Sequence, residues 1–393
     1  MANLRYGIVT YKGRRAGILR EEADGGTSFR YDDGFSETIA CAFPIEEGRE
    51  FRDENGLLPF FAHLGPEGWL RERQSAYADV DSEDDFGILL RFGRDCVGAV
   101  GILDPEKQDI ELKNLTSTLD KAATETDRTI SGVQAKILCV QDGQVIRPAG
   151  PEGAARLIAK FPKHDLEGMV RNEATSLELC ALLLGKEEVN AAQVGMVESI
   201  DGVALIIHRF DRAGDEKLRC EDFMQVLSKR PGKDHRGKYN ATYEDLGKAL
   251  RYSSAIVLDQ RRAFLRLVAY VLTGNVDCHM KNWSLLETDT GMRLSPVYDV
   301  LNGYIYGSKG YTTRFGLLIG DERKQWQAYD RPLLLSVADR MGLPRRVAEA
   351  ALKSLERRKT PFFDRLGRPV GMDESLTYEY RASVGEAWER LYG

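Results

Sequence analysis

The side chains best suited to chemistry lie in one short polar segment, Gly274–Asn282 (GNVDCHMKN), and just beyond the hairpin predicted after it. In this segment Asp277 precedes Asn282 by five residues, and a second carboxylate, Asp299, follows the hairpin. Because the two strands of a hairpin lie side by side, we expect Asn282 and Asp299 at the same end of it. Oxygen ligands in this number suit Mg²⁺, which keeps waters and phosphate oxygens as its other ligands.

The order of helix, polar loop, hairpin and Asp is also that of protein kinases, in which a catalytic-loop Asp precedes an Asn by five residues. By this logic Asp277 accepts the proton of an acceptor hydroxyl, while Asn282 and Asp299 hold the metal. Lys281 would offset charge on the transferring phosphoryl group. The alternative is a loop after a helix, in which Asp and Asn serve as turn residues.

A phosphate-handling site also needs groups upstream, and a small-residue turn over Thr129–Lys136 (TISGVQAK) is one candidate. Backbone N–H groups in such turns form anion-binding nests. The Walker pattern GxxxxGK[ST] is absent, and an ordinary hairpin turn has a similar composition. The candidate nucleotide contacts in this turn are Ser131, Gly132, Val133, Gln134 and Lys136.

The apolar strand predicted around Leu157–Phe161 carries a single charge, Lys160. Burying an ammonium group is costly unless an anion pairs with it. Lys160 therefore either lies on a solvated face of the strand or points into a cleft toward phosphates. Glu173, near the start of the next predicted helix, is suited to anchor it, as the strand Lys and helix Glu of kinases anchor each other.

A hinge between two lobes is expected where the apolar run Val203–Ile207 ends. The residues that follow are His208, Arg209, Phe210 and Asp211. Backbone groups in such a hinge are suited to meet the edge of an adenine, with the Phe210 ring packing nearby. A surface strand ending in a solvated charge cluster is the alternative.

The elements that must position these groups fall into two parts. With 393 residues and 44.1 kDa the chain suits two lobes or domains. The first hundred residues are predicted to be β-rich, with strands over 6–10, 15–19 and 27–31, whereas helices dominate beyond residue 243. The polar stretch from Asp104 to Arg128 is the predicted linker. This pattern predicts a two-lobed α+β fold with a cleft between the lobes.

Composition excludes several classes of protein. The 55 basic and 61 acidic side chains give a formal charge of −6, which will not by itself hold the chain on nucleic acid or an anionic membrane. No stretch approaches the roughly 18 apolar residues of a membrane helix, and the first residues contain no apolar signal segment. The six cysteines are dispersed without a CxxC pair. We therefore expect a cytoplasmic protein with reduced thiols.

Taken together, these segments resemble the HipA family of serine/threonine kinases, the toxin halves of bacterial toxin–antitoxin pairs. The resemblance covers nearly the whole chain, with the motifs in the family's order. The motifs are Leu64–Gly68, Gly93–Val100, Ile130–Lys136, Asn172–Glu173, Arg209–Arg212, Glu221–Asp222, Lys238–Tyr239, Gly274–Asn282 and Pro296–Asp299.

The resemblance implies a two-lobed, protein-kinase-like α+β fold with an added β-rich N-terminal subdomain and a largely helical C-terminal lobe. The expected boundaries are 1–104 for the subdomain, 105–128 for a linker, 129–212 for the kinase N-lobe and 213–393 for the C-lobe. The resemblance also implies a kinase that depends on ATP and Mg²⁺ and phosphorylates a component of translation, such as glutamyl-tRNA synthetase, to arrest growth. A small helix-turn-helix antitoxin (HipB-like) would neutralise it and provide its only, indirect, contact with DNA.

Members of this family also phosphorylate themselves in the phosphate turn. The matching residue here is Thr129, with Ser131 as a second candidate, and a phosphate there would expel the turn and silence the kinase. His208 stands where the family commonly has Glu, and Thr129 where it has Ser. Two other hypotheses stay open: a small-molecule phosphotransferase of kinase-like fold, and a non-catalytic co-repressor that clasps a DNA-binding partner.

Overall fold

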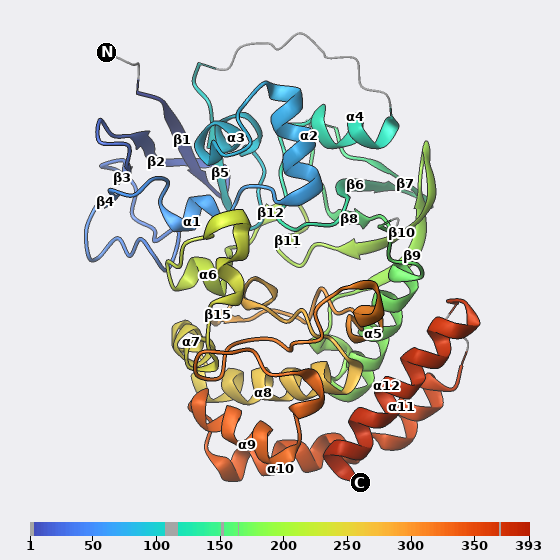
Figure 1. Ribbon diagram of the computed structural model, residues 1–393. Coiled ribbons are helices and arrows are strands. Elements are labelled where there is room, and N and C mark those ends of the chain that lie inside the picture. Colours follow the sequence, from blue (N-terminus) through green and yellow to red (C-terminus); the bar gives the residue numbers. More distant parts are fainter. Residues whose placement is uncertain (1–3, 107–116, 151–152, 164, 369–370) are drawn as a thin grey trace. The chain divides into compact units, whose positions relative to one another are not determined.

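The computed structural model describes residues 4–106, 117–150, 153–163, 165–368 and 371–393. The chain forms two compact units, and Figure 1 labels most of their helices and strands. The first unit contains Met1–Phe161, Met196–Gly202 and Asp211–His235. The second unit contains Pro162–Gly195, Val203–Phe210 and Arg236–Gly393.

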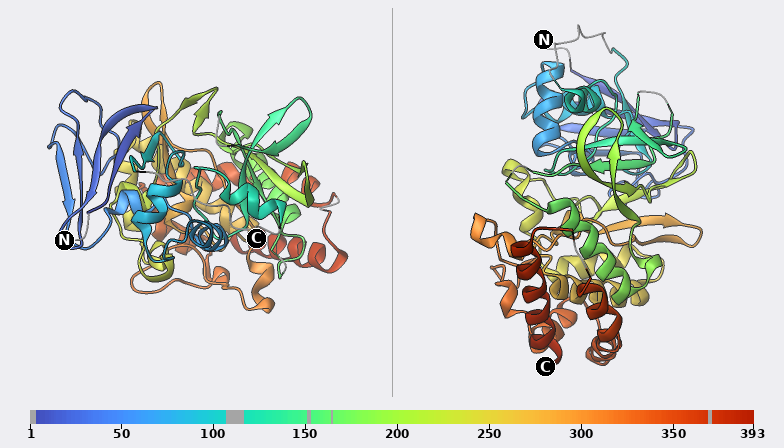
Figure 2. Two further views of the ribbon diagram at one scale, coloured as in Figure 1. Left: turned by 90° about the horizontal axis from the view of Figure 1, so that it is seen from above. Right: turned by 90° about the vertical axis from the view of Figure 1, so that its right-hand side faces the viewer.

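An antiparallel sheet with the strand order β4-β3-β2-β1-β5 opens the first unit, in blue in Figure 2. Its strands are β1 (Tyr6–Tyr11), β2 (Arg14–Glu21), β3 (Thr27–Tyr31), β4 (Glu50–Asp53) and β5 (Val100–Leu103). The strands predicted over 6–10, 15–19 and 27–31 are confirmed. Phe29, Phe43 and Phe61 pack against one another in the core beneath the sheet.

The helices of the first unit are α1 (Pro59–Ala62), α2 (Gly68–Ala78), α3 (Asp85–Phe92), α4 (Thr118–Thr124) and α6 (Phe223–Val226). Helix α4 lies within the predicted linker 105–128 and packs against α2. The Ser117 hydroxyl begins this helix by accepting a hydrogen bond from the Asp120 N–H. Residues 107–116 of the predicted linker lie outside the described residues.

A second antiparallel arrangement in the first unit places β6 (Lys136–Asp142) between β7 (Val145–Pro148) and β8 (Leu157–Lys160). The tip of the hairpin formed by β9 (Ala192–Val197) and β10 (Ile200–His208) also belongs to this unit, where the Glu198 N–H donates to the Ile146 carbonyl at 2.7 Å. Three short strands complete it: β11 (Arg212–Ala213), β12 (Glu216–Lys217) and β13 (Cys220–Asp222).

The second unit is largely helical, as predicted for the end of the chain (Figure 1). Its helices are α5 (Met169–Leu184), α7 (Tyr243–Ala249), α8 (Ile256–Thr273), α9 (Arg331–Arg340), α10 (Arg345–Glu356), α11 (Lys359–Leu366) and α12 (Glu374–Tyr392). Helix α8 packs against α5, α10 and α12, so α5 belongs to this unit although the prediction grouped 129–212 together. In the described part of the chain, no helix has both the length and the apolar character that crossing a membrane requires.

The predicted hairpin is present as β14 (Ser284–Thr288) and β15 (Gly291–Leu294). The two strands pair antiparallel from Leu285 opposite Leu294 to Thr288 opposite Gly291. The prediction of strands on both sides of a turn at 288–291 is therefore confirmed.

Candidate active site

The polar loop begins where helix α8 ends, at Gly274. This glycine has a φ of +71° and its N–H reaches the carbonyl oxygens at the end of the helix, which is the usual way a glycine ends a helix. A Cβ added to Gly274 would lie 2.4 Å from Oδ1 of Asn302. Glycine is therefore required both for the backbone conformation and for the close approach of Asn302.

The loop is locked by hydrogen bonds to the carbonyl oxygen of Asp277. The side-chain Nδ2 of Asn282 donates to it at 2.8 Å, and the backbone N–H of His279 donates to it at 2.9 Å. Because the Asn282 amide nitrogen is used in this way, its Oδ1 is the atom left to act as a ligand. The side chain of Asn282 is buried, so this orientation is fixed by packing as well.

The residue before Asp299 contacts the same loop. The hydroxyl of Tyr298 donates to the carbonyl oxygen of Lys281 at 2.8 Å and lies 2.6 Å from Oγ of Ser284. Asp299 itself has a φ of +57°, in the left-handed region that few residues other than glycine adopt. Such backbone strain is concentrated at functional sites, where the surrounding structure holds it in place.

Asp259 of α8 anchors the hairpin through one buried carboxylate. It accepts hydrogen bonds from the Ser253 hydroxyl, from the guanidinium groups of Arg262 and Arg293, and from the Leu294 N–H. Burial alone would raise the pKa of Asp259, but these hydrogen bonds outweigh it and lower the pKa to about 2. The register of β15, and with it the approach of the chain to Asp299, depends on this carboxylate.

These residues fit a divalent cation that prefers oxygen. Asn282 has an oriented amide oxygen, and Asp299 directly follows Tyr298, whose hydroxyl contacts the same loop. Hard oxygen donors of this kind, one or two per ion, are what Mg²⁺ takes from a protein when phosphate oxygens and waters complete its shell.

The carboxylate of Asp277 is exposed, and Tyr239 orients it. The Tyr239 hydroxyl donates to Oδ1 of Asp277 at 2.9 Å. The Tyr239 ring is held in turn by the Arg323 guanidinium, 4.8 Å from the ring centroid, and by the edge of the His279 ring at 5.1 Å. Sequence reasoning missed this contact, and its only signal was the presence of Tyr239 in the family motif Lys238–Tyr239.

Asn172 of helix α5 holds the segment after Asp299. Its Oδ1 accepts from the Asn302 N–H at 2.8 Å, and its Nδ2 donates to the Asn302 carbonyl at 3.1 Å. Asn172 is fully buried, and the next residue, Glu173, is also buried. The sequence offered Asn172 only as part of a motif, whereas the structure gives it a positioning role.

In the first unit, Lys136 of β6 and Lys160 of β8 are directly opposite each other in the antiparallel pairing. Each is only 5% exposed, so the solvated-face alternative for Lys160 is wrong. Cross-strand partners point to the same face of a sheet. The predicted role of Lys136 and Lys160 in contacting nucleotide phosphates stays a prediction. The predicted pairing of Lys160 with Glu173 stays a prediction.

The turn that precedes Lys136 is built tightly around its ammonium group. Lys136 Nζ donates to the Ser131 carbonyl at 3.1 Å. Gly132 has a φ of +118°, and a Cβ there would lie 2.1 Å from Lys136 Nζ. Thr129 is buried, with its hydroxyl lacking a hydrogen-bond partner among the described residues, whereas Ser131 is half-buried. The positive φ at 132 favours glycine there, since the Lys136 ammonium group is the end of a flexible side chain that can move away from an added Cβ.

Within the segment predicted as a hinge, Phe210 and Asp211 have different surroundings. His208 is exposed and Arg209 is buried, while the Phe210 ring packs on Tyr298 with centroids 5.4 Å apart. The Asp211 carboxylate accepts the Gly98 N–H at 2.8 Å and pairs with Arg212. This use of Asp211 favours a structural role, and the predicted nucleotide contacts of the segment stay predictions.

Arg212 extends this contact into a buried ion cluster of the first unit. Its guanidinium pairs with Asp95 at 2.7 Å, and the same carboxylate also pairs with Arg128 and Lys217. The cluster therefore joins the motif Gly93–Val100 to the residue that precedes the phosphate turn.

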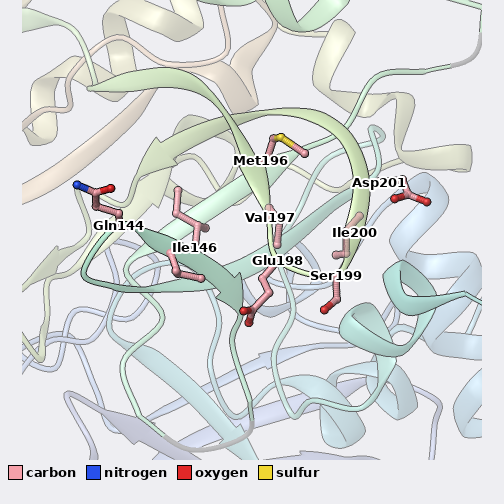
Figure 3. A pocket seen from close by; sticks show the side chains of 9 residues that line it. Gln144, Ile146, Met196, Val197, Glu198, Ser199, Ile200 and Asp201 are labelled. Carbon is pink, nitrogen blue, oxygen red and sulfur yellow. The ribbon is translucent and has the colours of Figure 1, made fainter.

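A separate open pocket of about 470 Å³ lies between the β6–β7 turn and the tip of the β9–β10 hairpin (Figure 3). Residues 144–146 and 196–201 line it, and none of the predicted site residues is among them. It is therefore a feature distinct from the candidate active site.

Comparisons with known proteins agree with these features. The curated proteins similar to this chain include a putative kinase, Y4dM, of Sinorhizobium fredii, which is 29% identical over 75% of this chain and 76% of its own length. The serine/threonine-protein kinase toxin HipA of Shewanella oneidensis is 24% identical over 77% of this chain and 76% of its own length.

Among solved structures, HipA from the complex of Shewanella oneidensis HipA, HipB and operator DNA has a TM-score of 0.73 and 20% identity, covering 98% of this chain and 97% of that one. This likeness confirms the predicted two-lobed α+β fold. The model of the HipA N-terminal domain matches residues 7–103, and that of the HipA-like C-terminal domain matches residues 128–360. Since the second match alone spans more than half of the sequence, the chain belongs to the HipA family.

Proposed function

We propose that this protein is a serine/threonine kinase that transfers the γ-phosphoryl group of ATP to a hydroxyl group of another protein. The observation that carries the proposal is the loop itself. The Asn282 amide is locked on the Asp277 carbonyl, and Tyr298 ties the Asp299 segment to the same loop. Family membership supports the same chemistry.

Asp277, whose carboxylate is exposed, has the role of the general base. The acceptor hydroxyl oxygen attacks the γ-phosphorus as its proton passes to Asp277, and the P–O bond to ADP breaks. Tyr239 occupies Oδ1 of that carboxylate, so the hydroxyl proton goes to Oδ2. Lys281 offsets negative charge on the transferring group. Most of the rate enhancement in such reactions comes from positioning and charge stabilisation.

Asn282 and Asp299 would hold Mg²⁺, which when bound neutralises charge on the phosphates. Upstream, the backbone of the turn Ser131–Gln134, with Lys136 and Lys160, would receive the phosphates of ATP. The two lysines are opposite each other in the pairing of β6 with β8, and both side chains are buried within the first unit. Glu173 would anchor Lys160, and the segment His208–Asp211 would meet the adenine.

We further propose that a helix-turn-helix antitoxin binds this chain. The structural relative was solved in a complex of HipA, HipB and operator DNA. The charge of −6 supports contact with DNA only through that partner.

The protein acceptor would be a component of translation such as an aminoacyl-tRNA synthetase, and self-phosphorylation would fall on Thr129 or Ser131. Since Thr129 is buried, its modification requires the turn to open first.

The test is transfer of labelled phosphate from ATP in a cell lysate, comparing the protein with its Asp277→Asn variant. We expect labelled protein with the first and at least a 100-fold loss with the second, since general-base catalysis contributes about 10²–10⁴-fold. Label only in small molecules would favour a phosphotransferase of another class. No transfer, together with tight binding of a small DNA-binding protein, would favour the co-repressor hypothesis.

A further inference from the structure

The phosphate turn is held by the start of helix α2, a contact within the first unit. The Ser131 hydroxyl donates to Oε1 of Glu67 at 3.0 Å, and Glu67 is only 2% exposed. The Trp69 N–H faces the Val133 carbonyl oxygen at 3.5 Å. Ser131 and Val133 of the turn therefore both contact residues at the start of helix α2.

Gly68 makes this approach possible. Its φ is +52°, and a Cβ there would lie 2.8 Å from Cγ1 of Val133 and 2.9 Å from both its Cα and its carbonyl oxygen. Two of these three atoms belong to the backbone and cannot be moved by a change of rotamer. Any residue other than glycine would push the turn away from the helix.

The beginning of the turn is held in the same way. The fully buried Gln74 of α2 donates from Nε2 to the Arg128 carbonyl oxygen at 2.8 Å. The Thr129 N–H donates to the Asp95 carbonyl oxygen at 3.2 Å. Residues of the N-terminal domain thus fix the turn from its first residue to Val133.

Arg71 fixes the backbone around the start of α2, where Glu67 lies. Arg71 donates to the carbonyl oxygens of Pro66 at 3.4 Å and of Ser82 at 2.6 Å, and pairs with Asp85 at 2.7 Å. The backbone that carries Glu67 is therefore already ordered, and little further conformational entropy is lost there when the carboxylate binds Ser131.

We propose that Glu67 and Gly68 are positioning residues for the phosphate turn 129–136. They hold the backbone N–H groups of this turn in the conformation that receives nucleotide phosphates. The role in nucleotide binding rests on the proposed function, whereas the ordering of the turn does not. The motif Leu64–Gly68, which sequence analysis matched only by resemblance, thereby gains a physical reason.

The test measures amide hydrogen exchange over residues 129–136 in the nucleotide-free, full-length protein. Glu67→Ala should speed this exchange about fivefold, the effect of one lost hydrogen bond. Glu67→Gln keeps an acceptor for Ser131 and should restore slow exchange. Gly68→Ala should speed exchange about tenfold or more, because the added Cβ meets backbone atoms. Strand β2 serves as the internal reference, whose exchange stays unchanged.

Gly143→Ala is the matched control for Gly68→Ala. Gly143 has a φ of +60°, and a Cβ there meets nothing within 4 Å, so the variant carries the backbone strain without the clash. The proposal would be overturned if residues 129–136 exchanged at the same rate in the Gly68→Ala and Gly143→Ala variants. It would also be overturned if Glu67→Ala left their exchange rate unchanged.

A second readout separates this proposal from the kinase assignment. In the active enzyme, Glu67→Ala should raise KM for ATP about fivefold and change kcat less than twofold, because it disturbs binding rather than transfer. A KM that stays constant would overturn the positioning role toward nucleotide. If the unaltered protein transfers no phosphate, the proposed function fails, and the exchange experiment still decides whether Glu67 and Gly68 order the turn.

Discussion

The carboxylate of Asp259 offers a quantitative prediction, because its effect on stability follows from its pKa. Its pKa is about 2, against 3.8 for an ordinary aspartate. Since each pKa unit corresponds to 1.36 kcal/mol, ionised Asp259 contributes about 2 kcal/mol to folding at neutral pH. A pKa lowered in the folded state stabilises above the unfolded pKa of 3.8, and this contribution disappears as the pH falls through about 2. At pH 3 about half of it is gone.

At neutral pH, Asp259→Asn should lower the free energy of unfolding by more than the contribution of the ionised carboxylate. The amide places an N–H₂ group among donors and leaves Arg293 and Arg262 without their shared carboxylate. Removing one partner of a buried ion pair costs about 3–5 kcal/mol. We therefore expect the variant to lose about 3 kcal/mol in free energy of unfolding at pH 7, and the difference from the unaltered protein to shrink by about 1 kcal/mol at pH 3.

The assay is urea unfolding followed by tryptophan fluorescence, which reports mainly on the second unit because Trp283, Trp326 and Trp388 are buried there. Asp339→Asn, at an exposed aspartate of α9, is the matched control and should stay within about 0.5 kcal/mol of the unaltered protein. A cost below about 1 kcal/mol for Asp259→Asn, or a difference that is the same at pH 7 and pH 3, would refute the reasoning.

Three further predictions concern the second unit. Asp299→Ala should remove the Mg²⁺-dependent heat of ATP binding in calorimetry, as chelation of Mg²⁺ should in the unaltered protein; a retained signal would contradict the metal role. Tyr239→Phe loses one hydrogen bond worth about 1 kcal/mol, so kcat should fall about fivefold, whereas Tyr252→Phe, at an exposed tyrosine, should not change it. Asn172→Ala leaves two backbone groups of Asn302 without their bonds and should lower the free energy of unfolding by about 2 kcal/mol or more, so an unchanged urea midpoint would count against its positioning role.

The parts of the fold that sequence reasoning reached are those specified locally. Strand β3 was predicted with the bounds that the structure has, and the β14–β15 hairpin follows from two apolar runs around a turn. The prediction that Asn282 and Asp299 lie at the same end of that hairpin rests only on its geometry. Some short elements were not predicted. The four residues of β4 and the eight of α11 are too few to show a clear hydrophobic periodicity.

Contacts between distant segments were out of reach for another reason. The bond from Gly98 to Asp211 joins residues 113 positions apart, and that from Tyr239 to Asp277 joins residues 38 apart. No spacing rule connects such pairs, so the bond between the Asp211 carboxylate and the Gly98 N–H was not predicted. The orientation of Asn282 was equally hidden, since an amide shows which of its atoms serves as a ligand only once its partner is known.

The paired bonds between Asn172 and the backbone of Asn302 have a mechanical consequence. They couple helix α5, which carries Glu173, to the segment that carries Asp299, so a rotation of the helix drags the carboxylate along with it. We therefore expect that a compound that displaces α5 would also displace the segment after Asp299, and with it the proposed ligand of Mg²⁺.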